Sequence, residues 1–231
     1  MDAAIIVAII ALVASVVTAA ISIYGQTHAA ALQARREAQS TLSRYREPLV
    51  AAAYELQSRL FNILRQDFLK KYYLEGDDSQ REYAVENTLY LVGQYLGWSE
   101  ILRRKIQFLD FGEVQETREV SVLQDAIREL FSTDKEAIGR PFMIWRGQQR
   151  AIGERMIVSE DGDLLCMGYG LFADRADDDG FWCWFKPLEA DIDVVARAPN
   201  ERLRLLQHAL IDLIERLDAS GIRFPQRIER A

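Results

Sequence analysis

The feature that most constrains this chain is an uncharged stretch close to its beginning. Residues 4–24 read AIIVAIIALVASVVTAAISIY and include no Asp, Glu, Lys or Arg. At about 1.5 Å per residue, a helix of 21 residues spans about 30 Å, the thickness of a bilayer core. A cleaved signal peptide is the alternative, but it combines a basic start with an apolar run of about 7–15 residues. The stretch therefore predicts a transmembrane helix within residues 1–25.

The charges that flank this stretch predict its orientation. Arg35, Arg36, Arg44 and Arg46 follow it, and no Lys or Arg precedes it. Positive charge is retained on the cytoplasmic side of a membrane. We therefore expect the N-terminus outside and the rest of the chain in the cytoplasm, where a reducing environment suits two unpaired cysteines.

Small residues recur within the same stretch at spacings of 4, 3, 4, 3 and 4, and they are Ala4, Ala8, Ala11, Ser15, Thr18 and Ser22. Helices in lipid associate through small residues and polar contacts, and a period of 3.5 residues favours left-handed supercoiling. We expect the chain to form a homo-oligomer along this seam. The alternative is chance, because Ala and Ser are common in membrane helices.

The segment that follows predicts a helical stalk over residues 26–47, since it is rich in Ala, Gln, Arg and Glu. Pro48 is expected to end or bend this stalk and to begin a new helix. In that helix, apolar residues recur at helical spacing at positions 49, 53, 56, 60 and 63. Similar patterns continue to about residue 137.

The pattern changes after residue 138. Runs at 141–147, 154–172 and 181–185 predict strands, with Asp161-Gly162 as a hairpin turn. Leucines at 203, 206, 210, 213 and 217 predict a last helix. The expected fold class is thus helix-dominated α+β: an N-terminal transmembrane helix, a helical stalk, and a cytoplasmic domain at 48–231 with a small antiparallel sheet. That domain has a helical part (48–137) and a mixed part (138–231).

Recognisable catalytic and cofactor motifs are absent from the sequence. There is no phosphate-binding loop ending in Gly-Lys-Ser/Thr, no serine nucleophile elbow and no His-Glu-x-x-His. GYGLFA (168–173) matches Gly-x-Gly-x-x-Ala, but its glycines lie in a predicted strand, where they indicate a bulge or a close backbone approach. We therefore predict neither an enzyme nor a cofactor.

A metal site is not predicted either. His28, His208, Cys166 and Cys183 lack any common zinc-ligand spacing. The acidic segment 174–181, DRADDDGF, fails the EF-hand pattern and is read as a solvated loop. Cation binding and docking of a basic partner are the alternatives for this segment.

The segment most typical of a binding site is 144–156, IWRGQQRAIGERM. It places together six residues with donor or stacking side chains: Trp145, Arg146, Gln148, Gln149, Arg150 and Arg155. Arginine forks bind phosphate, and an aromatic face stacks on a base. The cluster predicts a site for an anion, a nucleotide or a short single-stranded nucleic acid. The alternative is a set of surface arginines paired with Glu154, Glu160 or Asp161, and the net charge of −7 argues against a broad basic nucleic-acid surface.

Four segments, at 43–69, 86–110, 146–156 and 206–218, resemble a largely uncharacterised family of small bacterial proteins with one N-terminal membrane span. That family carries no established catalytic residues. The layout is also similar to membrane effectors of anti-phage defence, such as the membrane partner in Hailong-type systems. The resemblance implies an inner-membrane effector that acts on the membrane, for example by forming a pore, and responds to a nucleotide or oligonucleotide made by a companion nucleotidyltransferase. A passive scaffold that tethers a protein partner, or an enzyme of unknown type, are the alternatives.

Overall fold

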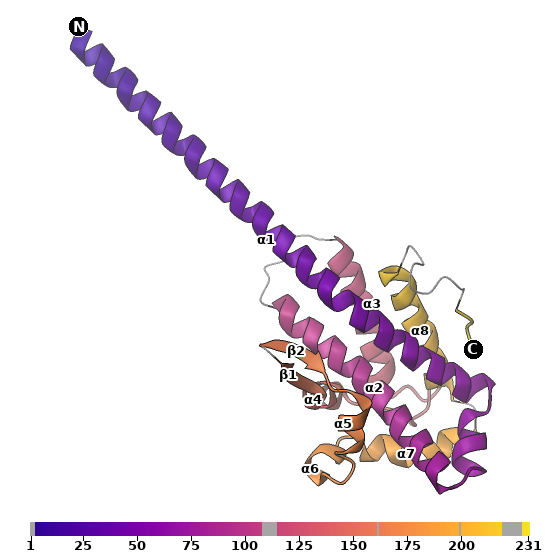
Figure 1. The fold of residues 1–231 in the computed structure, drawn as a ribbon. Helices are drawn as coiled ribbons and strands as arrows, with labels where there is room; N and C mark the ends of the chain where they lie inside the picture. Colours follow the sequence, from indigo (N-terminus) through magenta and orange to yellow (C-terminus); the bar gives the residue numbers. More distant parts are fainter. Residues whose placement is uncertain (1–2, 108–114, 161, 199, 219–227) are drawn as a thin grey trace.

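The computed structural model describes residues 3–107, 115–160, 162–198, 200–218 and 228–231. The side chains of residues 3–11, 13, 14, 20, 31, 34–43, 106, 107 and 115–117 lie outside that description. One long helix, α1 (Ala3–Arg65), enters a helical body with its C-terminal part and projects from it with its N-terminal part (Figure 1).

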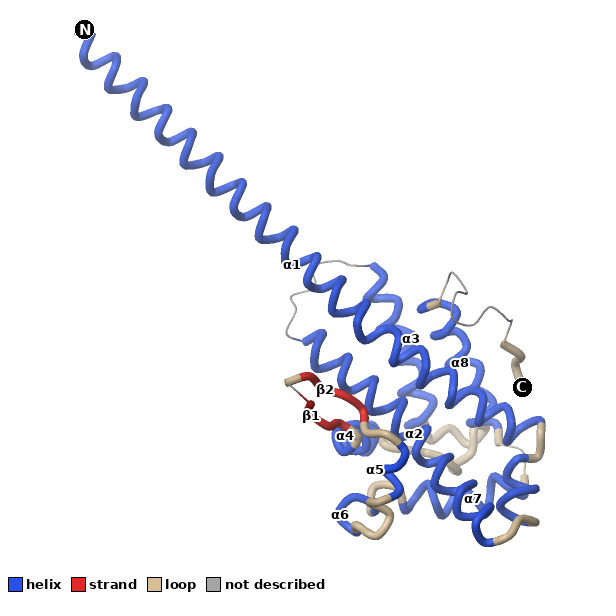
Figure 2. Tube along the Cα trace, viewed as in Figure 1, coloured by secondary structure: helices blue, strands red, loops and turns tan. Residues whose placement is uncertain are grey.

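The body is built mainly from helices. After α1 come a short π-helix, η1 (Lys70–Leu74), and the helices α2 (Asp78–Gln107), α3 (Gln115–Ser132) and α4 (Arg146–Arg155). The hairpin β1 (Ile157–Glu160) and β2 (Asp163–Cys166) comes next. It is followed by the helices α5 (Tyr169–Ala173), α6 (Asp179–Trp182), α7 (Lys186–Arg197) and α8 (Glu201–Leu217). The predicted helix-dominated α+β class with a small antiparallel sheet is confirmed (Figure 2).

Helix α1 does not end at Pro48, contrary to the sequence-based expectation. Proline has no N–H to donate to the carbonyl of residue 44, which weakens the helix at that turn. The side chains of Tyr45, Leu49 and Val50 around it are nevertheless buried in the core. Packing thus favours continued helix over the local preference of proline, and α1 extends through the predicted stalk into the body.

The core lies where α1 packs against α2 and α8. On α1, the predicted apolar face is buried at Leu49, Ala53, Leu56 and Leu60. On α8, the predicted leucine stripe is buried at positions 203, 206, 210, 213 and 217. Residues from both the helical and the mixed part belong to one continuous hydrophobic cluster. Full burial of each large apolar side chain in this cluster stabilises the fold by about 1.5–3 kcal/mol.

The hairpin confirms one strand prediction and corrects the others. Strands β1 and β2 pair antiparallel from Ile157 with Cys166 to Glu160 with Asp163, and Gly162 in the turn has φ 83°. Residues 141–145 form no strand, and α4 begins at Arg146. The predicted strand at 154–172 is interrupted, since 154–155 belong to α4 and 169–173 form α5.

The aromatic run 181–185 is helix and turn rather than strand. The Asp178 carboxylate accepts the N–H groups of Gly180 (2.9 Å) and Phe181 (3.3 Å), which starts α6. The rings of Phe181 and Phe185 then pack on Phe172, with centroids 5.6 and 5.1 Å away. A five-residue apolar run has no periodicity that separates strand from helix, and here the cap and the ring cluster decide.

The expected bulge in GYGLFA is also wrong, because Gly168 precedes α5 instead of lying inside a strand. The dinucleotide pattern still lacks its context. The only sheet among the described residues has two antiparallel strands, whereas that motif needs a parallel βαβ unit.

The side chains of Ala4, Ala8 and Ala11 in the predicted seam lie outside the described residues, and Ser15, Thr18 and Ser22 are exposed on the projecting part of α1. Within the described part of the chain, no helix has an apolar stretch long enough to cross a membrane.

Candidate functional site

A pocket of about 220 Å³ lies between α2, α3 and α4. Its lining combines four arginines, two carboxylates and two amides with a few less polar side chains: Tyr95, Leu96, Ser99, Glu100, Arg103, Gln124, Asp125, Arg128, Arg146, Gln149 and Arg150. Three of these, Arg146, Gln149 and Arg150, come from the segment that the sequence singled out. The pocket is therefore the natural candidate for the predicted anion site.

Close contact between α2 and α4 forms one wall of this pocket. A Cβ atom on Gly153 of α4 would lie 2.7 Å from the Leu96 carbonyl oxygen and 2.9 Å from the Glu100 Cβ. A Cβ on Gly97 of α2 would lie 2.9 Å from the Met156 Cβ. Only glycine permits this approach, which packs the last turn of α4 against α2.

Positive charge exceeds negative charge in the pocket lining, with four guanidinium groups against two carboxylates. Arg103 binds Glu100 through two hydrogen bonds of 2.6 and 2.7 Å, and Arg128 binds Asp125 at 2.5 Å. Arg146 pairs with Glu129, 2.8 Å away. Arg150 is exposed and has no ion pair among the residues that the structure describes, so it is available to an incoming anion.

Glu100 is the buried electrostatic centre of the wall formed by α2. Its side chain is buried, and its carboxylate accepts hydrogen bonds from both Arg103 and Arg104, the latter at 2.9 Å. Burial by itself would raise the pKa of Glu100, but the hydrogen bonds and charges of the two arginines outweigh burial, and the pKa is lowered. The carboxylate is thus ionised at neutral pH and orders the two guanidinium groups.

Two buried amides in the lining have polar atoms without a partner. Gln149 donates from Nε2 to the carbonyl oxygens of Ile144 (2.8 Å) and Arg128 (3.0 Å), which leaves Oε1 with no donor. Gln124 Nε2, on α3, has no acceptor. Native proteins seldom leave such atoms unpaired, since each costs about 1–3 kcal/mol.

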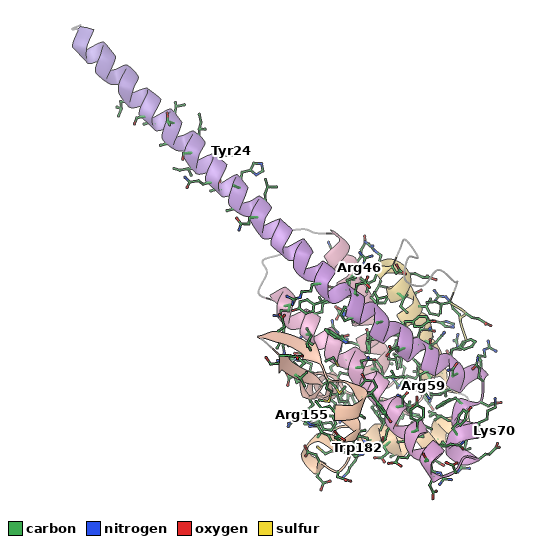
Figure 3. All side chains as sticks on the ribbon, viewed as in Figure 1. Tyr24, Arg46, Arg59, Lys70, Arg155 and Trp182 are labelled. Atoms are coloured by element: carbon green, nitrogen blue, oxygen red, sulfur yellow. The ribbon has the colours of Figure 1, made fainter. Side chains whose placement is uncertain are left out.

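The other half of the predicted cluster lies outside the pocket lining. Trp145 is 54% exposed, and its backbone N–H donates to Gln148 Oε1 at 3.1 Å, so Gln148 caps α4. Arg155, labelled in Figure 3, is exposed at the C-terminal end of α4. The alternative of pairing within the segment does not hold for Arg146, whose partner Glu129 belongs to α3. Glu154 pairs instead with Arg104 of α2 (3.2 Å).

Sequence reasoning missed the residues that α2 and α3 contribute, chiefly Arg103, Gln124 and Arg128. Arg103 and Arg128 each follow an acidic residue by three positions, which is the ordinary pattern of a solvated helix face. Only the tertiary contact of α2 with α4 reveals a shared site. The available signals were Gly97 and Gly153, glycines within helical segments, which indicate close approach of a neighbouring element.

Metal binding finds no support in the described residues, in which no three His, Cys, Asp or Glu side chains are grouped closely enough to hold an ion. The ring nitrogen Nε2 of His208, on α8, lies 2.8 Å from the Ala231 carbonyl oxygen and links the last residues to the body.

The chain matches no protein-family model, no curated protein and no solved structure at a significant level.

Proposed function

We propose that this protein is a membrane-anchored, homo-oligomeric effector whose body binds an anionic ligand, such as a nucleotide, in the pocket between α2, α3 and α4. The observation that carries the proposal is the excess of arginine in the lining, including Arg150 with no ion pair in the described structure. Arginine forks bind phosphate oxygens through two parallel hydrogen bonds.

The anchor in this proposal is residues 4–24, which lie in the projecting part of α1 and have no charged side chain. The N-terminus would be outside and the body cytoplasmic, at the inner membrane of a bacterium. The seam from Ala4 to Ser22 would join copies of the chain, and the polar residues of the seam would face a pore or a water-filled path. A companion nucleotidyltransferase is the expected source of the ligand.

Binding is tested on the full chain in detergent with a fluorescent mononucleotide, titrated at about 50 and 200 mM salt, because screening weakens contacts between arginine and phosphate. Arg150→Glu should reduce the affinity at least tenfold, since it puts a carboxylate in the lining. Arg155→Glu is the matched control, with the same charge change on the same helix outside the pocket. Equal affinity of both variants would exclude this pocket as the site.

The membrane part of the proposal has its own test. Expression of an effector should depolarise cells or slow their growth, and removal of residues 2–25 should abolish that effect. A passive scaffold, the second candidate, should leave growth unchanged with or without the segment. A cytoplasm-only reporter fused after Ala231 should be active; a reporter active only outside would reverse the orientation.

A further inference from the structure

We infer that the ligand of this pocket carries a planar hydrogen-bonding edge beside its anionic group, as a nucleoside monophosphate does, and that Gln124 and Gln149 recognise this edge. The inference rests on the proposed function, because it concerns the same pocket. It goes further by naming the ligand's second chemical feature and its size.

The orientation of the Gln149 amide follows from its partners. Both groups that it touches with Nε2, the backbone oxygens of Arg128 and Ile144, can only accept hydrogen bonds. The amide nitrogen of Gln149 must therefore face these two carbonyl oxygens, and Oε1 is the atom that remains unpaired. Gln149 is only 3% exposed, so α4 presents a desolvated acceptor at the pocket.

Helix α3 contributes the complementary group to the same lining. Gln124 is 6% exposed, and its Nε2 is a buried donor with no acceptor. A leucine at this position would avoid the cost of an unpaired amide, so core packing gives no reason for glutamine. A ligand that brings one donor and one acceptor would pair both atoms.

Nucleobases have such edges: adenine, for example, presents an amino donor beside a ring-nitrogen acceptor, and glutamine is a usual partner for it. Phosphate would meet the arginines of the same lining, with Arg150 the one that has no ion pair in the described structure. The volume of about 220 Å³ is below the range of about 300–1,000 Å³ usual for drug-sized ligands. This size favours a single nucleotide over an oligonucleotide.

Both unpaired atoms are shielded from solvent, so binding requires rotation of neighbouring side chains. Arg103 and Arg128 are the candidates, because each pairs with a carboxylate of its own helix and can exchange it for phosphate. Recognition by buried polar atoms rejects ligands that lack the matching edge, since those atoms then stay unpaired.

The test compares AMP and UMP with ribose 5-phosphate, by calorimetry on the full chain in detergent at low salt. Ribose 5-phosphate keeps the phosphate and lacks the base. At least one nucleotide should bind tenfold or more tightly than ribose 5-phosphate. Gln124→Leu should remove this difference and leave the ribose 5-phosphate affinity unchanged, and its melting temperature should equal or exceed that of the wild type.

Gln94→Leu is the matched control, because Gln94 of α2 also has a buried, unpaired Oε1 but does not line the pocket. It should keep the preference for the nucleotide. Equal binding of ribose 5-phosphate and both nucleotides would overturn the inference and leave anion binding intact. Loss of ribose 5-phosphate binding in Gln124→Leu, or a large fall in its melting temperature, would assign Gln124 a structural role and overturn the inference too. Absence of binding by all three probes would overturn the proposed function as well.

Discussion

Arg202 and Asp191 hold the same loop through backbone groups of opposite polarity. The Arg202 guanidinium donates to the carbonyl oxygens of Gly139 (2.5 Å) and Pro141 (3.2 Å), and the Asp191 carboxylate accepts the N–H of Phe142 at 2.7 Å. Phe142 has φ 61°, an uncommon value for a bulky residue, and is fully buried. This loop leads directly into α4, so the two side chains position one wall of the pocket.

Replacement of Arg202 by lysine should therefore destabilise the protein strongly. Arg202 is fully buried and also donates to the backbone oxygens of Leu130, Phe131 and Thr133. An ammonium group cannot reach this set of carbonyl oxygens from one position, and each acceptor left unpaired costs about 1–3 kcal/mol. We expect the free energy of unfolding in urea to fall by about 2–4 kcal/mol. Arg204→Lys, which alters a partly exposed pair with Glu201, should change it little; equal losses would contradict this view.

Gly153→Ala should separate α4 from α2. The added methyl group would lie 2.7 Å from the Leu96 carbonyl oxygen, so backbone must move. We expect a loss of about 1–3 kcal/mol in the free energy of unfolding, together with weaker nucleotide binding. Gly147→Ala, on the same helix, meets no atom within 4 Å and should stabilise by about 0.4–1 kcal/mol. A Gly153→Ala variant as stable as Gly147→Ala would show that the helices do not need this contact.

The stability of the protein should depend on Glu100 at acid pH. Its pKa in the folded state lies below the ordinary value of 4.5, so the folded state binds this proton less readily than the unfolded chain. The contribution is complete above pH 4.5 and is lost as the pH falls through the folded pKa. Urea midpoints between pH 7 and 3 should thus fall less steeply for Glu100→Gln than for the wild type. The exposed Asp177→Asn should retain the wild-type slope, and parallel curves for Glu100→Gln and the wild type would refute the assignment.

The two cysteines should differ sharply in reactivity. Burial raises the pKa of the Cys166 thiol to about 12, and its sulfur lies 3.8 Å from the Gln94 carbonyl oxygen. Cys183 is exposed. Because thiolate is the reactive form, a maleimide at pH 7.5 should label about one thiol rapidly in the native chain and two in denaturant. Cys183→Ser should remove the rapid phase; rapid labelling of that variant would mean that Cys166 is accessible.

Local sequence patterns correctly predicted the helices whose buried face follows a simple apolar periodicity, and the hairpin turn. The apolar faces at 49–60 and 203–217 and the hairpin turn at Gly162 are where the sequence placed them. The prediction failed where tertiary contacts decide, as at Pro48, which packing keeps inside α1, and at Phe181, which a cap and a ring cluster keep helical. For the pocket, Arg146, Gln149 and Arg150 could be predicted from their own segment.

The remaining part of the pocket could not be predicted in this way. Arg128 and Gln124 lie on a face of α3 that looks solvated in sequence, and their meeting with α4 depends on contacts distant in the chain. No local signal specifies which turn of α3 faces which turn of α4.

The continuity of α1 has a mechanical consequence. A helix advances about 100° per residue, so the angular phase of position 15 is locked to that of position 49, and twisting the body about the helix axis would turn the distal end by the same angle. Adding one alanine between residues 32 and 33 would advance that phase by about 100° and misalign the two ends. Adding seven would restore it to within about 20°, while moving the distal end about 10 Å farther away. The coupling between the two ends of α1 therefore depends on the rotational phase of the helix and tolerates changes in its length.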